Sequence, residues 1–195
     1  AEQLIPLGIQ IARALASAHE AGVFHRDVKP SNILAAGAGM WKLADFGVAH
    51  VPSSSLTMTG QFVGSPAYAA PEALVKGVTG AASDVYGLGA TLYEAAAGTW
   101  PRLEAKGALL APVPPLGTLA PDLPAHVCAA IDRALALEHA QRPTAAELAQ
   151  LLARGPAAAP TTTAPPPVRW KLWALGATAV AVLAILFATT RGSSH

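Results

Sequence analysis

Residues 25–32 read His-Arg-Asp-Val-Lys-Pro-Ser-Asn, and this stretch decides how the rest of the chain is interpreted. Two short motifs follow it in order: Asp45-Phe46-Gly47, eighteen residues after Asp27, and Ala70-Pro71-Glu72. The segment 45–72 is rich in Ser, Thr, Gly and Pro and has few periodic apolar residues, so we expect a long loop. Loops of that length inside a compact domain are usually functional, which makes the motifs at its ends the first candidates for a site.

Apolar periodicity predicts mainly helical structure around these motifs. Leu4, Ile11 and Leu15 recur at helical spacing, so residues 3–21 are expected to form an amphipathic helix. The other expected elements are, in chain order, β-type runs at 23–25, 33–35 and 41–44, a helix at 83–97, a Pro/Gly-rich connection at 98–124, a helix at 125–137 and a last helix from Thr144.

Two of these helices carry further information. The 83–97 helix is strongly apolar but too short to span a bilayer, so we interpret it as a buried core helix. Thr144 and Glu147 have the spacing of a capping box, in which the hydroxyl and the carboxylate each accept a backbone N–H at the helix start. Residues 155–168 cannot bury a core and are stiffened by Pro, so the domain is expected to end near residue 153.

Composition excludes some classes of protein. The formal net charge is +1, so there is no strong field to attract nucleic acid, and we expect no nucleic-acid partner. Cys128 is the single cysteine, which excludes an internal disulfide framework and fits a reduced, cytosolic compartment. Hydrophobic residues make up 52% of the chain, and part of that excess is local to its C-terminal end.

The C-terminal end has the pattern of one membrane-spanning helix. Residues 172–190 contain no charged residue, and as a helix they would cover roughly 28 Å, close to the hydrocarbon thickness. Trp170 and Trp173 stand at one end, where amphipathic rings favour the interface. The alternative is a buried core helix, but little chain is present for it to pack against. The expected division is therefore a domain at 1–153, a Pro/Ala/Thr-rich linker at 154–170, a transmembrane helix at 171–191 and a short tail at 192–195.

Charged residues around this segment give its expected orientation. Arg154, Arg169 and Lys171 lie on the domain side, whereas Arg191 alone lies on the other. The positive-inside rule then places the domain in the cytoplasm, with a single pass through the plasma membrane. Gly176 and the neighbouring Ala residues permit helix pairing in the membrane, which leaves a homodimer open.

The three ordered motifs resemble those of eukaryotic-like (Hanks-type) protein kinases, over about residues 1–153. The linker, the transmembrane segment and the paired threonines of the loop resemble bacterial receptor kinases of the PASTA type. The resemblance implies a mainly α fold, namely the C-terminal lobe of a protein kinase, a helical bundle with short β-hairpins at the catalytic loop, plus one transmembrane helix. It also implies a serine/threonine-protein kinase that transfers the γ-phosphoryl group of ATP to protein hydroxyls, with ATP and Mg²⁺ as cofactors.

The resemblance carries the family's roles onto matching positions. Asp27 would accept the proton of the substrate hydroxyl, and Lys29, typical of serine/threonine kinases, would stabilise the transferred phosphoryl group. Asn32 and Asp45 would bind the metal through hard oxygen ligands, which Mg²⁺ prefers. The alternative for a lone loop Asp is a turn or cap residue. The family's structural positions are matched by His25, Phe46, Gly47, Glu72, Asp84 and Arg142, with Arg142 expected to pair with Glu72 and Asp84 to anchor the catalytic-loop backbone.

Regulation is expected in the long loop. Thr57 and Thr59 resemble autophosphorylation sites, and a phosphate there would pair with Arg26 and order the loop. The alternative is that such loops are simply rich in Ser and Thr. Ser65 matches the family's residue that contacts the catalytic Asp and Lys, and is expected to lie at the substrate.

The sequence contains no Gly-rich phosphate loop and no strand lysine before residue 25. A kinase holds ATP between two lobes, so we expect the 195 residues alone to be inactive. Three interpretations follow: a segment of an active transmembrane receptor kinase, a non-catalytic membrane-tethered binding module, or a structural membrane protein with a relic domain. The first is favoured because all four residues expected of this lobe are present, and its partners would be ATP, protein substrates and the membrane.

Overall fold

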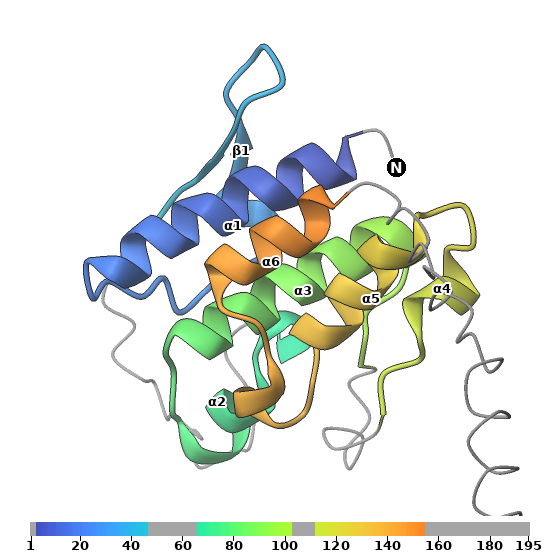
Figure 1. Cartoon of the computed structure of the whole chain (residues 1–195). Helices are drawn as coiled ribbons and strands as arrows, with labels where there is room; N and C mark the ends of the chain where they lie inside the picture. Colours follow the sequence, from blue (N-terminus) through green and yellow to red (C-terminus); the bar gives the residue numbers. More distant parts are fainter. Residues whose placement is uncertain (1–2, 47–65, 103–111, 155–195) are drawn as a thin grey trace, which may run out of the picture. The chain divides into compact units, whose positions relative to one another are not determined.

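The computed structural model of the chain describes residues 3–46, 66–102 and 112–154 (Figure 1). These residues belong to one compact unit, Ala1–Pro156. No helix within these three ranges is long and apolar enough to cross a membrane. The predicted linker and the predicted transmembrane helix at 171–191 lie outside the described residues.

The described unit is helix-rich, with one small sheet. Its helices are α1 (Leu4–Glu20), α2 (Pro71–Lys76), α3 (Ala81–Ala97), α4 (Leu116–Leu119), α5 (Ala125–Ala134) and α6 (Ala145–Ala153). Its strands are β1 (Ile33–Ala35) and β2 (Trp41–Leu43), and its 3-10 turns are η1 (Pro30–Asn32), η2 (Pro66–Tyr68) and η4 (His139–Gln141).

Helix α3 forms the centre of the core. Its residues 84–93 are all buried, and α1, α5 and α6 pack around it (Figure 1). Small residues allow the helices to approach closely: a Cβ at Gly8 of α1 would lie 2.9 Å from Leu152 Cδ1 and 3.1 Å from Leu92 Cδ1. Burial on all sides over this stretch explains why α3 is strongly apolar, as the sequence indicates.

The 25–32 loop packs directly on α3. A Cβ at Gly87 would lie 2.7 Å from the carbonyl oxygen of Val28, and Val28 is itself buried. Only a residue without a side chain permits this approach of helix and loop backbone. The fold thus seats the 25–32 loop against its most buried helix.

The two strands form an antiparallel hairpin directly after that loop. Ile33 faces Leu43 and Ala35 faces Trp41 in the register. The hairpin extends from the helical body beside α1 (Figure 1). Its open end joins η1 on one side and Ala44-Asp45 on the other, so strand pairing brings the ends of two sequence motifs together.

Several sequence predictions are confirmed at the level of elements. The helices expected at 3–21 and 83–97 are α1 and α3, and the strands expected at 33–35 and 41–44 are β1 and β2. The capping box at Thr144 is present: Thr144 Oγ1 accepts from Glu147 N–H at 3.2 Å, and Glu147 Oε2 accepts from Thr144 N–H at 2.8 Å.

Two predicted elements near the ends of α1 and α5 are wrong. Residues 23–25 do not form a strand, because the His25 N–H donates to the Asp84 carboxylate instead of to a neighbouring strand. The helix predicted at 125–137 ends at Ala134. The carbonyls of Ala136 and Leu137 instead accept hydrogen bonds from Arg142, at 2.9 and 3.2 Å.

Two short helices were assigned to loops from the sequence. Helix α2 begins at Pro71, inside the predicted 45–72 loop, where Pro is favourable at the first helical position. Helix α4 lies inside the predicted 98–124 connection. Leu116 is fully buried there, and its N–H donates to Asp132 Oδ1 at 3.0 Å, so tertiary contacts stabilise a helix too short to predict.

Candidate functional site

The backbone of the 25–32 loop is anchored on a buried carboxylate. Asp84, in the first turn of α3, is 1% exposed. Its two oxygens accept the N–H of His25 at 2.8 Å and the N–H of Arg26 at 2.6 Å. His19 Nε2 lies 2.8 Å from the Oδ2 of Asp84 as a third partner. A buried carboxylate needs such partners, so the loop and α3 fix each other's position.

The anchor holds an unusual backbone conformation. Arg26 has φ of 69°, in the left-handed region that non-glycine residues rarely adopt. Such conformations persist where the surrounding structure determines them, and they cluster at functional sites. Here the hydrogen bonds that Asp84 accepts from the N–H groups of His25 and Arg26 fix the positive φ of Arg26, which directs the chain towards Asp27.

His25 connects the first motif to the second. Its Nδ1 accepts the N–H of Asp27 at 3.2 Å, so its Nε2 carries the proton and donates to the Ala44 carbonyl at 2.7 Å. The ring also makes an edge contact with Phe46, with centroids 4.9 Å apart. His25 is 3% exposed, and its buried ring connects the backbone of Asp27 to that of Ala44 through these two hydrogen bonds.

Three polar side chains meet on the loop. Lys29 Nζ lies 2.8 Å from Asp27 Oδ2, and Asn32 Nδ2 donates to the same oxygen at 3.3 Å and to the Asp27 carbonyl at 2.8 Å. The side chains of Asp27 and Lys29 are 38% and 30% exposed, so solvent and substrates can reach them. The result is a carboxylate that is oriented by an amide, paired with an ammonium and open on one side.

Asp45 is brought to this group through the backbone. The N–H of Ala44 donates to the Asn32 carbonyl at 2.8 Å, which extends the hairpin pairing by one step and places Asp45 next. Asp45 is exposed and has φ of 61°, a conformation that Asp tolerates better than most residues. The hydrogen bonds of Asn32 link it to Asp27, and the pairing of Ala44 with Asn32 places Asp45 at the same end of the hairpin.

The donor set fits a hard cation with phosphate ligands. Because the Nδ2 of Asn32 donates to Asp27, its Oδ1 is the amide's acceptor atom, and it accepts only a long hydrogen bond from Ser31 Oγ, at 3.4 Å, among the described residues. The Asp45 carboxylate is exposed and follows β2, the strand paired with the one after Asn32. Within the part of the chain that the structure describes, no group of three or more His, Cys, Asp or Glu could hold a metal by itself. One amide and one carboxylate suit Mg²⁺, which usually keeps waters and substrate phosphates as its other ligands.

The third motif is held by the expected ion pair. Arg142 binds both oxygens of Glu72, Nη1 to Oε1 at 2.7 Å and Nη2 to Oε2 at 2.8 Å. Ser83 Oγ also donates to Glu72 Oε1, at 2.9 Å. Burial raises the pKa of the Glu72 carboxyl, but the hydrogen bonds and charge of Arg142 outweigh it, so the pKa is lowered overall. The pair joins α2, at the end of the long loop, to the turn before α6.

Other residues of the site's support were not singled out in the sequence. His19 lies in the last turn of α1 and its ring reaches Asp84, although its position on the helix resembles that of any other polar residue. Tyr68 Oη donates to Glu94 Oε2 at 2.6 Å, which ties η2 to α3. No local signal identifies such partners, because each pair joins segments that are distant in the sequence.

Four predicted residues lie outside the described residues: Gly47, Thr57, Thr59 and Ser65. Arg26 is described and its side chain is exposed.

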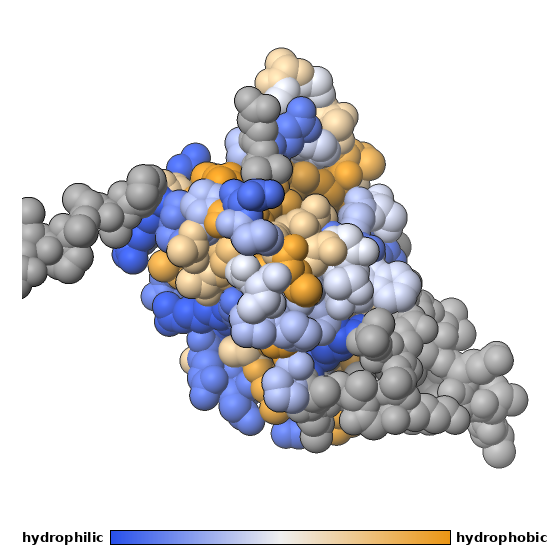
Figure 2. Space-filling view, turned by 90° about the vertical axis from the view of Figure 1, so that its right-hand side faces the viewer, coloured by the Kyte–Doolittle hydropathy of each residue, from blue (hydrophilic) through white to orange (hydrophobic). Residues whose placement is uncertain are grey.

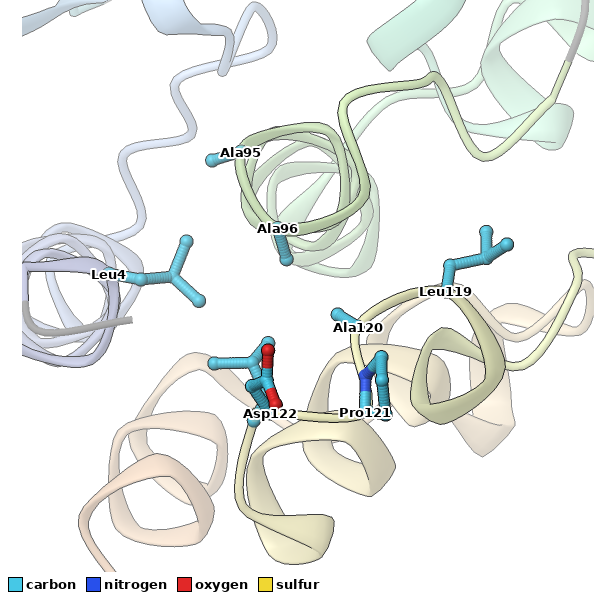
Figure 3. A pocket seen from close by; sticks show the side chains of 8 residues that line it. Leu4, Ala95, Ala96, Leu119, Ala120, Pro121 and Asp122 are labelled. Atoms are coloured by element: carbon cyan, nitrogen blue, oxygen red, sulfur yellow. The ribbon is translucent and has the colours of Figure 1, made fainter.

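A pocket of about 250 Å³ lies elsewhere in the fold (Figure 3). It is lined by Leu4 of α1, by Ala95 and Ala96 of α3, and by residues 119–123, which begin at the last residue of α4. Asp122 is its only ionisable side chain, and no residue of the 25–32 loop lines it. The face displayed in Figure 2 mixes hydrophobic and hydrophilic residues. The polar cluster at Asp27 therefore remains the candidate site.

The chain is similar to known proteins over most of its length. Residues 2–151 match the family model described as protein kinase domain. The serine/threonine-protein kinase PknK of Mycobacterium tuberculosis (strain CDC 1551 / Oshkosh) is 41% identical over 160 residues, 77% of this chain and 14% of PknK. PknA of M. tuberculosis (strain ATCC 25177 / H37Ra), also a serine/threonine-protein kinase, is 43% identical over 141 residues, 68% of this chain and 32% of PknA.

A solved structure has a similar fold. The crystal structure of Rad53 1–466 in complex with AMP-PNP matches with a TM-score of 0.57 and 24% identity, over 76% of this chain and 38% of that chain. The chain thus spans about a seventh to a third of the curated relatives.

Proposed function

Because this chain belongs to the protein kinase domain family, we propose that it is the catalytic lobe of a serine/threonine-protein kinase that uses ATP and Mg²⁺. The observation that carries the proposal is the cluster at Asp27. Its carboxylate is accessible, oriented by Asn32 and paired with Lys29 at 2.8 Å, on a loop anchored to the core. Phosphoryl transfer needs positioning and charge stabilisation more than covalent chemistry, and this cluster can supply both.

In the proposed reaction, a substrate Ser or Thr hydroxyl oxygen forms a bond to the γ-phosphorus of ATP. The bond from that phosphorus to the bridging oxygen breaks, and ADP leaves. Asp27 orients the hydroxyl and accepts its proton, and Lys29 stabilises the charge on the transferred group. The metal ion neutralises phosphate charge when bound, and Asn32 Oδ1 and the Asp45 carboxylate would hold it.

Regulation by phosphorylation is part of the proposal. A phosphate on Thr57 or Thr59 would carry about −1.5 to −2 charges at pH 7 and pair with the exposed Arg26 guanidinium. Because the backbone of Arg26 is bound to Asp84, such a pair would connect the loop to the core beside Asp27. Ser65 is proposed to contact substrate beside Asp27 and Lys29.

We also propose that the chain is anchored in the plasma membrane by a single helix at 171–191, with the kinase domain in the cytoplasm. Support comes from the uncharged run at 172–190, its flanking Trp residues and the excess of Arg and Lys on the domain side. A homodimer that pairs this helix, as in PASTA-type receptors, is the corresponding proposal for assembly. Proteolysis of inside-out vesicles that contain the protein tests the topology: residues 1–170 should be cleaved, and the chain from residue 171 onward should be protected.

The proposed activity is tested on the longest natural reading frame that contains these 195 residues. Purified protein is incubated with γ-labelled ATP, Mg²⁺ and a generic Ser/Thr protein substrate. Asp27→Asn should reduce transfer at least about a hundredfold, because general-base contributions are of that order or larger. Asp122→Asn makes the same chemical change at an exposed site and should leave transfer unchanged.

Two results would contradict the proposal. Equal transfer by the Asp27→Asn variant and its parent would show that this carboxylate is not catalytic. If the parent binds Mg·ATP or protein partners but transfers no phosphate, the chain is a kinase-like binding module instead.

A further inference from the structure

The side-chain amide of Gln10 joins α1 to the turn of the hairpin. Gln10 Oε1 accepts the N–H of Trp41 at 3.0 Å, and Gln10 Nε2 donates to the Gly39 carbonyl at 3.0 Å. A backbone N–H can only donate and a carbonyl can only accept, so the two partners fix which amide atom is which. Gln10 therefore forms a two-point clamp between the helix and the hairpin.

The hairpin depends on contacts of this kind. Each strand has three residues, and a two-stranded hairpin is marginally stable by itself in water. Its turn contains three successive residues with positive φ: Gly37 at 81°, Ala38 at 49° and Gly39 at 72°. Ala38 carries a Cβ in a conformation that non-glycine residues rarely adopt, which weakens the turn further.

The other end of the hairpin carries the proposed metal ligands. Asn32 comes directly before β1, and Asp45 follows β2 after one residue, Ala44. The Ala44 carbonyl accepts from His25 and the Ala44 N–H donates to Asn32, so this end is held by the 25–32 loop. Gln10, on α1, holds the turn end through the Gly39 carbonyl. Without the clamp, the strands would be held by the packing of Ile33, Trp41 and Leu43 against the core and by the Ala44 end, so both ligands would be less firmly directed.

We infer that Gln10 is a positioning residue for nucleotide-bound magnesium. It acts through the hairpin and touches neither metal nor nucleotide. The inference rests on the proposed function, since it assigns Gln10 a part in the same phosphoryl transfer. It predicts a selective effect: the affinity for Mg·ATP depends on the clamp, whereas the affinity for protein substrate does not.

The test compares Gln10→Met with Arg13→Gln in the longest natural reading frame. Met keeps the length of the side chain and a high helix propensity but removes both clamp bonds. Arg13 is exposed on the same helix, so its substitution controls for changes in α1. The Met variant should raise the KM for Mg·ATP roughly fivefold, the scale expected for about one lost net hydrogen bond. The KM of the Met variant for peptide substrate should match that of the parent. Arg13→Gln should match the parent in both KM values and in melting temperature.

A second readout follows the hairpin without catalysis. Hydrogen exchange of a peptide that covers 33–45 should become faster in Gln10→Met and remain unchanged in Arg13→Gln. Unchanged KM for Mg·ATP together with a lower melting temperature would overturn the inference, because the clamp would then serve stability alone. An equal rise of both KM values would also overturn it.

The two proposals fail in different ways. If the unmodified protein transfers no phosphate, the proposed function is wrong. The role of Gln10 is then tested by hydrogen exchange of the hairpin and by the affinity of Gln10→Met for Mg·AMP-PNP, measured by calorimetry. Faster exchange with weaker nucleotide binding in the Met variant supports the positioning role, and unchanged binding refutes it.

Discussion

The Arg142→Met variant should lower the stability of the domain by a large and measurable amount. Arg142 is 6% exposed and its side chain is completely buried. It donates to both oxygens of Glu72 and to the carbonyls of Ala82, Ala136 and Leu137. The guanidinium also lies over the ring of Tyr86, 4.9 Å from its centroid.

The size of the loss follows from what the substitution leaves behind. Met fills much of the volume but cannot donate, so the Glu72 carboxylate loses its cation. Breaking a buried pair from one side costs about 3 to 5 kcal/mol. Since small domains are stable by about 5 to 15 kcal/mol, this is a large share of the total. The melting temperature should fall by roughly 6 to 20 °C, from about 2 to 4 °C per kcal/mol for a domain of this size.

The assay is thermal and urea unfolding of the parent, Arg142→Met, Glu72→Gln and the double variant. Because the two residues touch, the double variant should lose much less than the sum of the single losses. Additive losses, or a loss below about 1 kcal/mol for Arg142→Met, would refute the role assigned to the pair.

The pH dependence gives an independent check with a defined sign. The folded pKa of Glu72 is lowered, so its unfolded form takes up a proton first as the pH falls. The stabilisation is therefore fully present above the ordinary glutamate range and is lost as the pH falls through the folded pKa. The difference in unfolding free energy between parent and Arg142→Met should shrink over that range, and a constant difference would show that charge pairing is not the cause.

Three further predictions concern the support of the site. Gly87→Ala should destabilise the domain by about 1 to 3 kcal/mol, because its Cβ would lie 2.7 Å from the Val28 carbonyl oxygen and neither backbone can move easily. Urea unfolding measures the loss, and an unchanged midpoint would show that the two backbones are not in close contact. Thr144→Ala should cost about 1 kcal/mol through the lost cap of α6, whereas Thr144→Ser should retain most of it; equal losses would show that the hydroxyl is not the cap. Asp84→Asn should speed hydrogen exchange at the 25–32 loop, because an amide keeps only one acceptor oxygen and one of the two backbone N–H groups loses its partner. Unchanged exchange there would show that the anchor is dispensable.

Elements that depend on contacts within one segment are predictable from the sequence, whereas elements that depend on contacts with distant segments are not. The helices at Leu4–Glu20 and Ala81–Ala97 were predictable because their apolar patterns repeat within each segment. The 23–25 run was misread as a strand because its composition favours β structure, while the partner of its backbone lies 59 residues away in Asp84. The short helices α2 and α4 fall in segments expected to be loops, because a helix of four to six residues has too few turns to show an apolar period.

The residue types at positions 27, 32 and 45, and the order of the motifs, are read directly from the sequence, so the chemistry of the candidate site is predictable without the fold. Only the tertiary structure decided how these residues are held. The Asp84 carboxylate binds the loop backbone, and Arg142 reaches Glu72 across 70 residues of sequence. Both contacts exist because α3 packs at the centre of the core and brings distant segments within hydrogen-bond distance. A sequence pattern does not encode such distances, since they depend on how whole helices pack.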